Sequence, residues 1–185
     1  MSWRVIPAIL IIAFACKNSE KKDSVEVGDT TIPAMIDTTR IPADSASADF
    51  LSEAARAGKV EVDLAGAATQ KATSQKLRDF ASMLLHDHTA TNEQVRDLAA
   101  RKVVQVADSM DTNVQEEIEA LKQKKGAEFD RAFLDRIVSD HQKSIRLFEK
   151  AAAGKDPDVA EFAMRTLNSL RIHLDSAKAL RSSLK

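Results

Sequence analysis

The sequence predicts an all-α protein: a four-helix bundle with a short additional helix between the second and third long helices. Alanine, leucine, glutamate, lysine and arginine dominate the 185 residues, and only 5 glycines and 4 prolines interrupt them, a composition typical of helices. Four long stretches repeat apolar residues at the spacing of one helix face. Short connections join these stretches, so we expect the helices to pack as a bundle.

One helical pattern occurs twice in the chain. FASMLLHDHTATNEQVRDLAA (80–100) and FLDRIVSDHQKSIRLFEKAAA (133–153) share Phe, an Asp-His pair and a closing Ala-Ala in the same register. This is a candidate internal repeat. Both copies place their aligned histidine, His88 or His141, on the apolar face of the predicted helix.

The N-terminal residues predict export. Residues 1–15 contain Arg4 and an apolar run too short to span a bilayer permanently, which is the form of a signal peptide. The run ends in Ala13-Phe14-Ala15-Cys16, which resembles the lipobox of bacterial lipoproteins except for Ala13, where leucine is usual. We expect Cys16 to carry the lipid; the alternative is an ordinary signal peptide followed by a stray cysteine. Lys17 then favours the outer membrane, with the protein facing the periplasm or the cell surface.

A flexible tether is predicted for residues 16–48, and the bundle for residues 49–185. The tether stretch is polar, contains Pro33 and Pro42, and lacks any sustained helical or strand period. If Cys16 is lipidated, the tether holds the bundle at a distance from the membrane.

The predicted helices follow in order. The first begins near Asp49, and a break at 72–74 lets Thr73 or Ser74 cap the second, which ends near Lys102. A short helix begins at Asp111 or Thr112 and ends within 122–125. The third long helix covers about 128–153, separated from the short helix by Gly126. Gly154 and Pro157 end it and start the last helix, with Asp156 as the expected N-cap, up to about Ser182.

Each long helix carries one ionisable residue on its apolar face: Glu61, His88, His141 and His173. A buried charge without a partner costs several kcal/mol, roughly, so the four are more easily explained together than separately. Imidazoles with a carboxylate suit one transition-metal ion: zinc, copper, iron or nickel. Asp87 and Asp140 precede His88 and His141 and would orient the imidazoles by hydrogen bonds.

A different interpretation of the same residues needs no metal. The histidines could hydrogen-bond to Glu61 and to one another, and so fix the packing of the helices. His86 lies two residues from His88 and faces nearly the opposite way, so it is not a candidate ligand. The methionines at 83, 110 and 164 show no repeated spacing and are expected to fill space.

These residues resemble a known bacterial family. FLSEAARAGKVEVDLAGAATQKATSQKLRDFASMLLHDHTATNEQ, AEFDRAFLDRIVSDHQKSIRLFEKAAAGKDPDVAEFAMRTL and LRIHLDSAKAL are similar to DUF4142, a family of unknown function whose members are labelled outer membrane proteins. The resemblance implies a ferritin-like bundle and a location in the cell envelope, but no reaction. Asn168 stands where proline is expected. The Glu-x-x-His elements of di-iron proteins are absent, because Leu85, Val138 and Leu170 precede the three histidines by three positions.

Charge and composition limit the function. The formal net charge is −1 with no basic block, which excludes a nucleic-acid footprint. One Cys and no Tyr exclude a disulfide within the chain and tyrosyl-radical chemistry.

The first hypothesis is a tethered envelope protein that binds a metal in its core, in metal handling or stress tolerance. The alternative is a non-catalytic envelope protein that contacts a protein partner of unknown identity. An enzyme is the least favoured class, because no nucleophile is paired with a base and no cofactor loop is present.

Overall fold

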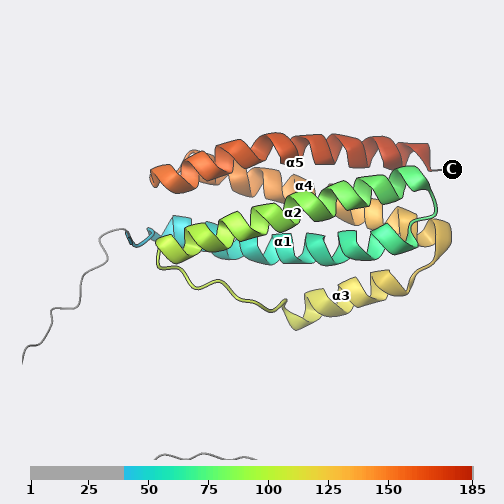
Figure 1. Cartoon of the computed structure of the whole chain (residues 1–185), viewed down its shortest axis with the longest axis horizontal. Helices are drawn as coiled ribbons and strands as arrows, with labels where there is room; N and C mark the ends of the chain where they lie inside the picture. Colours follow the sequence, from blue (N-terminus) through green and yellow to red (C-terminus); the bar gives the residue numbers. More distant parts are fainter. Residues whose placement is uncertain (1–39, 185) are drawn as a thin grey trace, which may run out of the picture. The chain divides into compact units, whose positions relative to one another are not determined.

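The computed structural model describes residues 40–184, and every regular element within them is a helix. The prediction of an all-α fold is therefore confirmed. The predicted signal peptide, Cys16 and most of the tether lie outside the described residues. Four helices of 27 residues and one of 12 follow each other along the chain (Figure 1): α1 Ser45–Lys71, α2 Gln75–Arg101, α3 Thr112–Gln123, α4 Gly126–Ala152 and α5 Pro157–Ser183.

The helix ends agree with the predicted caps at two positions and differ at two others. The side chain of Ser74 accepts a hydrogen bond from the backbone N–H of Leu77, and Asp156 caps α5 in the same way. α1 begins four residues earlier than expected, because Asp44 caps it through the N–H of Ser47 at 2.8 Å. Gly126, predicted to separate two helices, is instead the first residue of α4, with φ at +56°.

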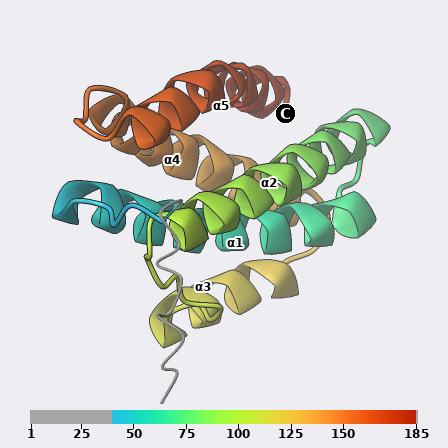
Figure 2. The same ribbon diagram turned by 60° about the vertical axis from the view of Figure 1, so that its left-hand side comes forward.

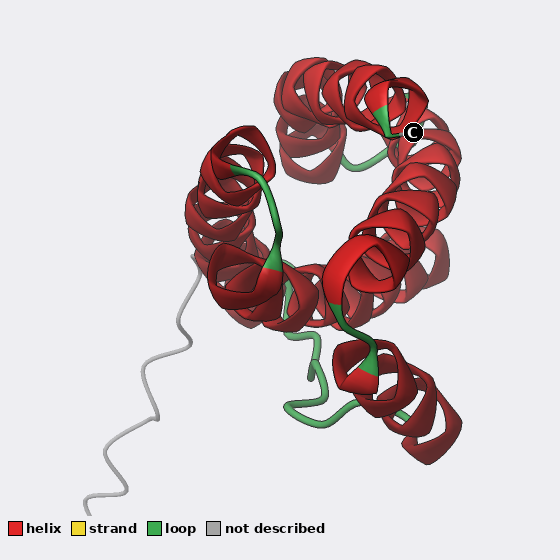
Figure 3. Cartoon of the chain, turned by 90° about the vertical axis from the view of Figure 1, so that its right-hand side faces the viewer, coloured by secondary structure: helices red, strands yellow, loops and turns green. Residues whose placement is uncertain are grey.

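The long helices form two hairpins. α1 packs against α2, and α4 packs against α5; the hairpins then meet through α1 with α4 and α2 with α5. α3 lies outside the four long helices, against α1 and α4 (Figure 2 and Figure 3). The two copies of the repeated pattern, α2 and α4, therefore lie diagonally opposite each other in the bundle. A residue on the inward face of one copy points toward the inward face of the other.

The apolar core of the described residues is divided into two clusters. One contains Leu64, Leu84 and Ile137, and the other contains Ala54, Val95, Phe148 and Leu170. Along α2, Leu84 belongs to the first cluster and Val95 to the second, with His88 between them. On the other three long helices the polar residue also lies at the boundary between members of the two clusters, so a polar layer separates them. None of the described helices is both long enough and apolar enough to cross a membrane.

Buried polar contacts hold the ends of the bundle. Near one end, the ammonium of Lys102 contacts the carboxylates of Asp156 at 2.8 Å and Asp158 at 2.6 Å, and thereby joins the end of α2 to the start of α5. At the other end, the buried carboxylate of Asp130 on α4 accepts hydrogen bonds from the backbone N–H and the hydroxyl of Thr73. Thr73 lies in the turn between α1 and α2. Both contacts compensate buried charge and fix the register of neighbouring helices.

Two glycines of α1 predict opposite outcomes for the same substitution. Nothing lies within 4 Å of a Cβ at Gly66, whereas a Cβ at Gly58 would lie 1.8 Å from Oδ1 of Asn92. Gly66→Ala should therefore raise the free energy of unfolding by about 0.5–1 kcal/mol, because alanine loses less backbone entropy in a helix. Gly58→Ala should not show this increase in the free energy of unfolding, because the Asn92 side chain must move to make room for the Cβ. Chemical denaturation of both variants measures the difference; equal stabilisation would contradict the close approach of α1 and α2.

Candidate metal centre

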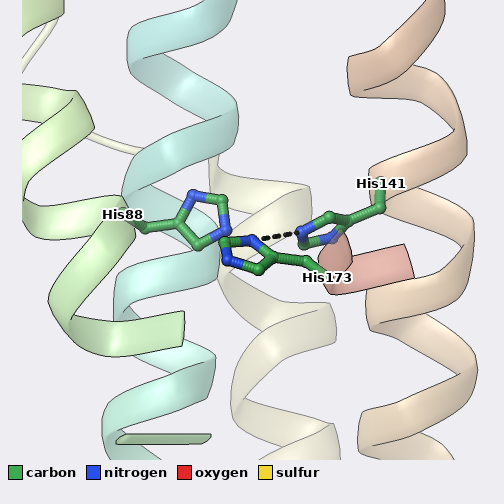
Figure 4. Close-up of side chains that lie close together, drawn as sticks. All are labelled: His88, His141 and His173. Carbon is green, nitrogen blue, oxygen red and sulfur yellow. Dashed lines mark hydrogen bonds between the residues drawn. The ribbon is translucent and has the colours of Figure 1, made fainter. Parts of the chain in front are cut away.

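The four polar residues predicted from the sequence meet in the layer between the two apolar clusters. Glu61, His88, His141 and His173 come from α1, α2, α4 and α5, and their exposed fractions are 2%, 5%, 0% and 2%. One ring nitrogen from each histidine lies within 4.8 Å of those of the other two (Figure 4). The sequence placed each residue on an inward face of its helix. The structure shows that the four side chains also lie at the same level along the bundle axis.

Hydrogen bonds on the outer side of two imidazoles fix which nitrogen carries a proton. Nδ1 of His141 lies 3.1 Å from the carbonyl oxygen of Ile137, one turn earlier in α4. Nε2 of His173 lies 2.9 Å from Oδ2 of Asp87. A carbonyl and a carboxylate only accept hydrogen bonds, so both nitrogens are donors. In the neutral form of each ring, the other nitrogen then presents a lone pair.

These two lone pairs face each other. Nε2 of His141 lies 3.3 Å from Nδ1 of His173, the contact drawn as a dashed line in Figure 4. Two lone pairs at this distance repel each other unless a cation lies between them, either a proton or a metal ion. Two nitrogens on one tetrahedral ion, each about 2.0–2.1 Å from it, are separated by about 3.3 Å. The observed spacing of these two nitrogens therefore matches the spacing of two ligands on one tetrahedral ion.

The electrostatics favour His141 over His173 as the carrier of a shared proton. Burial alone would lower the pKa of His141, but the attraction of the nearby Glu61 carboxylate raises that pKa above its usual value. Burial lowers the pKa of His173, and the neighbouring histidines lower it further, against the opposing effect of Asp87. Of the two rings, His141 is thus the one that binds a proton between Nε2 and Nδ1 of His173 more readily.

Glu61 supplies the negative charge on the other side of the cluster. Its Oε2 lies 2.9 Å from Nε2 of His88, and its Oε1 lies 3.1 Å from Nδ1 of His141. Burial would raise the pKa of the Glu61 carboxyl, but the charges of the nearby His88 and His141 rings lower it well below its usual value. Glu61 is therefore an anion, and it offsets the charge of any cation held by the histidines.

Two buried atoms of the cluster remain without a hydrogen bond: Oε1 of Glu61 and Nε2 of His88. Each lies within 3.1 Å of an atom of opposite charge, Nδ1 of His141 or Oε2 of Glu61, without forming a hydrogen bond to it. Buried polar atoms are nearly always satisfied, and exceptions often mark a functional site. Both atoms belong to a donor set of imidazoles and a carboxylate, which suits zinc, copper, iron and nickel. The residues present therefore fit a transition-metal ion.

The two aspartates of the predicted site have different surroundings. Asp87 holds an imidazole as expected, but that of His173 on α5 and not that of its neighbour in sequence, His88. Asp140 pairs with Arg136 and Lys143 at the surface and makes no hydrogen bond to an imidazole within the described residues, which differs from the prediction. Adjacent helical residues point about 100° apart. An aspartate next to an inward histidine therefore reaches a different helix or the solvent.

One contributor to the site was not identified from the sequence. The carbonyl of Ile137 orients His141, and a backbone carbonyl has no residue-type signature. The only available signal is position, because Ile137 precedes His141 by one helical turn. His86 is exposed, as expected, and lies outside the cluster.

Comparisons with known proteins find a matching family and solved structures of similar fold. The model of a family described as "Domain of unknown function (DUF4142)" matches residues 36–180. The chain superimposes on the crystal structure of a DUF305 fragment from Deinococcus radiodurans with a TM-score of 0.70 and 14% identity, covering 77% of this chain and 99% of that one.

Two further similar structures are of one protein, CopM. Its Cu(I)-bound form gives a TM-score of 0.61 at 18% identity, over 72% of this chain and 93% of that one. Its Cu(II)-bound form gives a TM-score of 0.61 at 15% identity, over 75% of this chain and 97% of that one. At these identities the similarity shows the fold alone. A search of curated proteins finds no significant match.

A pH-dependent stability difference is expected for Glu61→Gln. The lowered pKa of Glu61, below 4.5, stabilises the folded state above about pH 4.5, and this contribution is lost as the pH falls. The raised pKa of His141, above 6.5, stabilises it below about pH 6.5, and this contribution is lost as the pH rises. The variant should therefore be less stable than the wild type by about 1–3 kcal/mol between these values, and by less on either side. Urea unfolding of both proteins, repeated from about pH 3 to about pH 9 in steps of about one pH unit, measures the difference in the free energy of unfolding.

The control for this prediction is Glu53→Gln, which removes an exposed carboxylate from the same helix. It should differ little from the wild type at any pH. A difference between wild type and Glu61→Gln that stays constant across the range would contradict the ionic role of Glu61.

Proposed function

The chain belongs to the DUF4142 family, whose description assigns no function, and from its buried histidines we propose that it binds one transition-metal ion through His88, His141 and His173. The observation that carries the proposal is the pair of facing lone pairs on His141 and His173, 3.3 Å apart. The Ile137 carbonyl and the Asp87 carboxylate hold the outer nitrogens as donors. Imidazoles held in this way are the usual arrangement of histidine ligands.

Copper is the first candidate for the ion. Imidazole nitrogens suit copper and zinc alike, and the description of CopM names copper-bound forms of a protein with a similar fold. The positive charge of the ion would remove the repulsion between the two lone pairs and would neutralise the buried Glu61 carboxylate. Glu61, predicted from the sequence as a ligand, acts in this proposal as the charge-balancing anion beside the imidazoles.

Binding and transfer of the ion account for the site better than catalysis does. The three imidazoles lie in a buried layer, and no nucleophile and base are paired there. We therefore propose a role in metal handling or in tolerance to metal stress. A ferritin-like relationship is part of the proposal, supported by four long helices around one buried site; the missing Glu-x-x-His elements argue against di-iron chemistry.

A purely structural role is the second candidate, and one observation favours it. With a single proton between His141 and His173, the chain from Asp87 to the Ile137 carbonyl is fully hydrogen-bonded. Such a cluster would fix helix register without a ligand. It leaves Nε2 of His88 unsatisfied, whereas an ion held by all three histidines would engage His88, and for this reason metal binding is the first proposal.

Metal loading distinguishes the two. The purified full chain is stripped with a chelator, exposed separately to Cu(I), Cu(II) and Zn(II), and analysed for metal by mass spectrometry. We expect one ion per chain, and loss of stoichiometric binding in His88→Ala, His141→Ala and His173→Ala. Asp87→Asn should weaken binding by roughly 10–100-fold, because it orients a ligand without contacting the ion.

The matched control is His86→Ala, which removes an exposed histidine from the same helix as His88. It should bind metal like the wild type. Folded wild-type protein that retains no ion, or variants of the three histidines that bind as well as the wild type, would leave the structural role as the explanation.

We also propose that the protein is exported and anchored in the cell envelope through a lipid on Cys16. The support is the apolar run followed by Ala13-Phe14-Ala15-Cys16 in the sequence. Nucleic acid is not among the expected partners, and a protein partner is not identified. Growth with a labelled fatty acid should label the wild type and not Cys16→Ser. An unlabelled wild type in the envelope fraction would favour an ordinary signal peptide.

A further inference from the structure

A small pocket adjoins the histidine cluster on one side. It has a volume of about 20 Å³ and is lined by all four long helices. Its inner wall is formed by Glu61, His88 and His173, and its outer wall includes the hydroxyl or amide side chains of Thr91, Asn92 and Ser169. Ser169 is exposed and Asn92 is half-buried. The pocket therefore runs from the surface between α2 and α5 to the candidate ligands.

The size and the chemistry of the pocket suit one water molecule. A buried water needs roughly 10–15 Å³ and two to four polar partners. The pocket provides about 20 Å³. One unsatisfied buried atom, Oε1 of Glu61, belongs to a residue of its inner wall and can accept a hydrogen bond from the water, while His88 of the same wall is a candidate ligand of the ion. Hydroxyl groups of the outer wall offer further partners.

The ligand count at the histidines points to the same place. Within the described residues, the group able to hold an ion comprises His88, His141 and His173 and no fourth side chain. Zinc sites with three protein ligands keep a fourth position for water or another small ligand. The pocket contacts two of these histidines, so it is the side on which a fourth ligand can approach.

Asn92 limits what can enter. Its amide lies directly over the backbone of Gly58, and a Cβ at Gly58 would lie 1.8 Å from Oδ1. Both residues line the pocket. The glycine thus permits the Asn92 side chain to lie across the space between α1 and α2, and Asn92 keeps the pocket close to the size of one water.

We propose that this pocket binds one water-sized ligand, water or hydroxide, which takes the fourth position on the ion held by the three histidines, and that Asn92 excludes larger ligands. The inference rests on the proposed metal binding. If Glu61 were instead the fourth ligand, the ion would have no position for water, and the experiment below separates the two arrangements.

The test uses the full chain loaded with Cu(II), after its metal content has been measured. Electron paramagnetic resonance spectra are compared in ordinary water and in water enriched in oxygen-17, whose nuclear spin broadens the copper lines when water is bound. Azide, a linear triatomic anion, is then titrated while the visible absorption is followed. The variants are Asn92→Ala, which enlarges the pocket, and Asn168→Ala, which removes an exposed amide of α5 outside it.

We expect oxygen-17 broadening in the wild type, and azide binding at least tenfold tighter in Asn92→Ala than in the wild type or Asn168→Ala. Absence of broadening in protein that holds one Cu(II) would overturn the proposal, since the protein would then fill every position. Azide affinities that agree within twofold across all three proteins would also overturn it. Failure of the proposed metal binding is recognised separately, because no Cu(II) would then be retained.

Discussion

The structure depends on the burial of four ionisable side chains in one layer of an otherwise apolar core. Glu61, His88, His141 and His173 separate the two apolar clusters, and none of them could be buried alone without a cost of several kcal/mol, roughly. They are tolerated because they neutralise each other across helices: Glu61 contacts His88 and His141, and His141 contacts His173. Each helix must therefore keep its rotation and its height relative to the other three. Apolar packing alone would permit slippage that this layer forbids.

The same layer prepares the histidines for a cation. The Ile137 carbonyl and the Asp87 carboxylate each accept from the outer nitrogen of one ring, so in the neutral rings the two inner nitrogens, 3.3 Å apart, carry the lone pairs. Glu61 contributes negative charge from a buried position, and Asp87 contributes it from near the surface. A proton satisfies part of this arrangement, while a metal ion can also engage His88, whose Nε2 is otherwise unsatisfied. The structural and the metal-binding interpretations therefore differ in the cation that the layer holds, and both need the same residues.

Departures from the sequence predictions have local causes. Asp140 occupies the same position in the second copy of the repeated pattern as Asp87 does in the first. However, α4 carries Arg136 one turn before Asp140, and the ion pair between them satisfies the Asp140 carboxylate. The corresponding position before Asp87 is Met83, which offers no charge, and Asp87 instead meets His173 of α5. At the start of α1, Asp44 supplies a cap that extends the helix to Ser45. The sequence placed the start near Asp49, because large apolar residues appear only after it, at Phe50 and Leu51, and the additional turn before them contains none.

The sequence by itself determined the helices, most of their ends and the inward face on which each candidate ligand lies. These properties follow from local rules: the helical period decides which residues share a face, and Ser74 and Asp156 cap the helices that follow them. Only the tertiary structure decided that the four polar residues meet at one height, that Asp87 orients His173, and that Gly58 brings Asn92 over the pocket. Each of these depends on the rotation and axial shift of one helix against another. That geometry is set by the packing of the whole core and has no signature within any single helix.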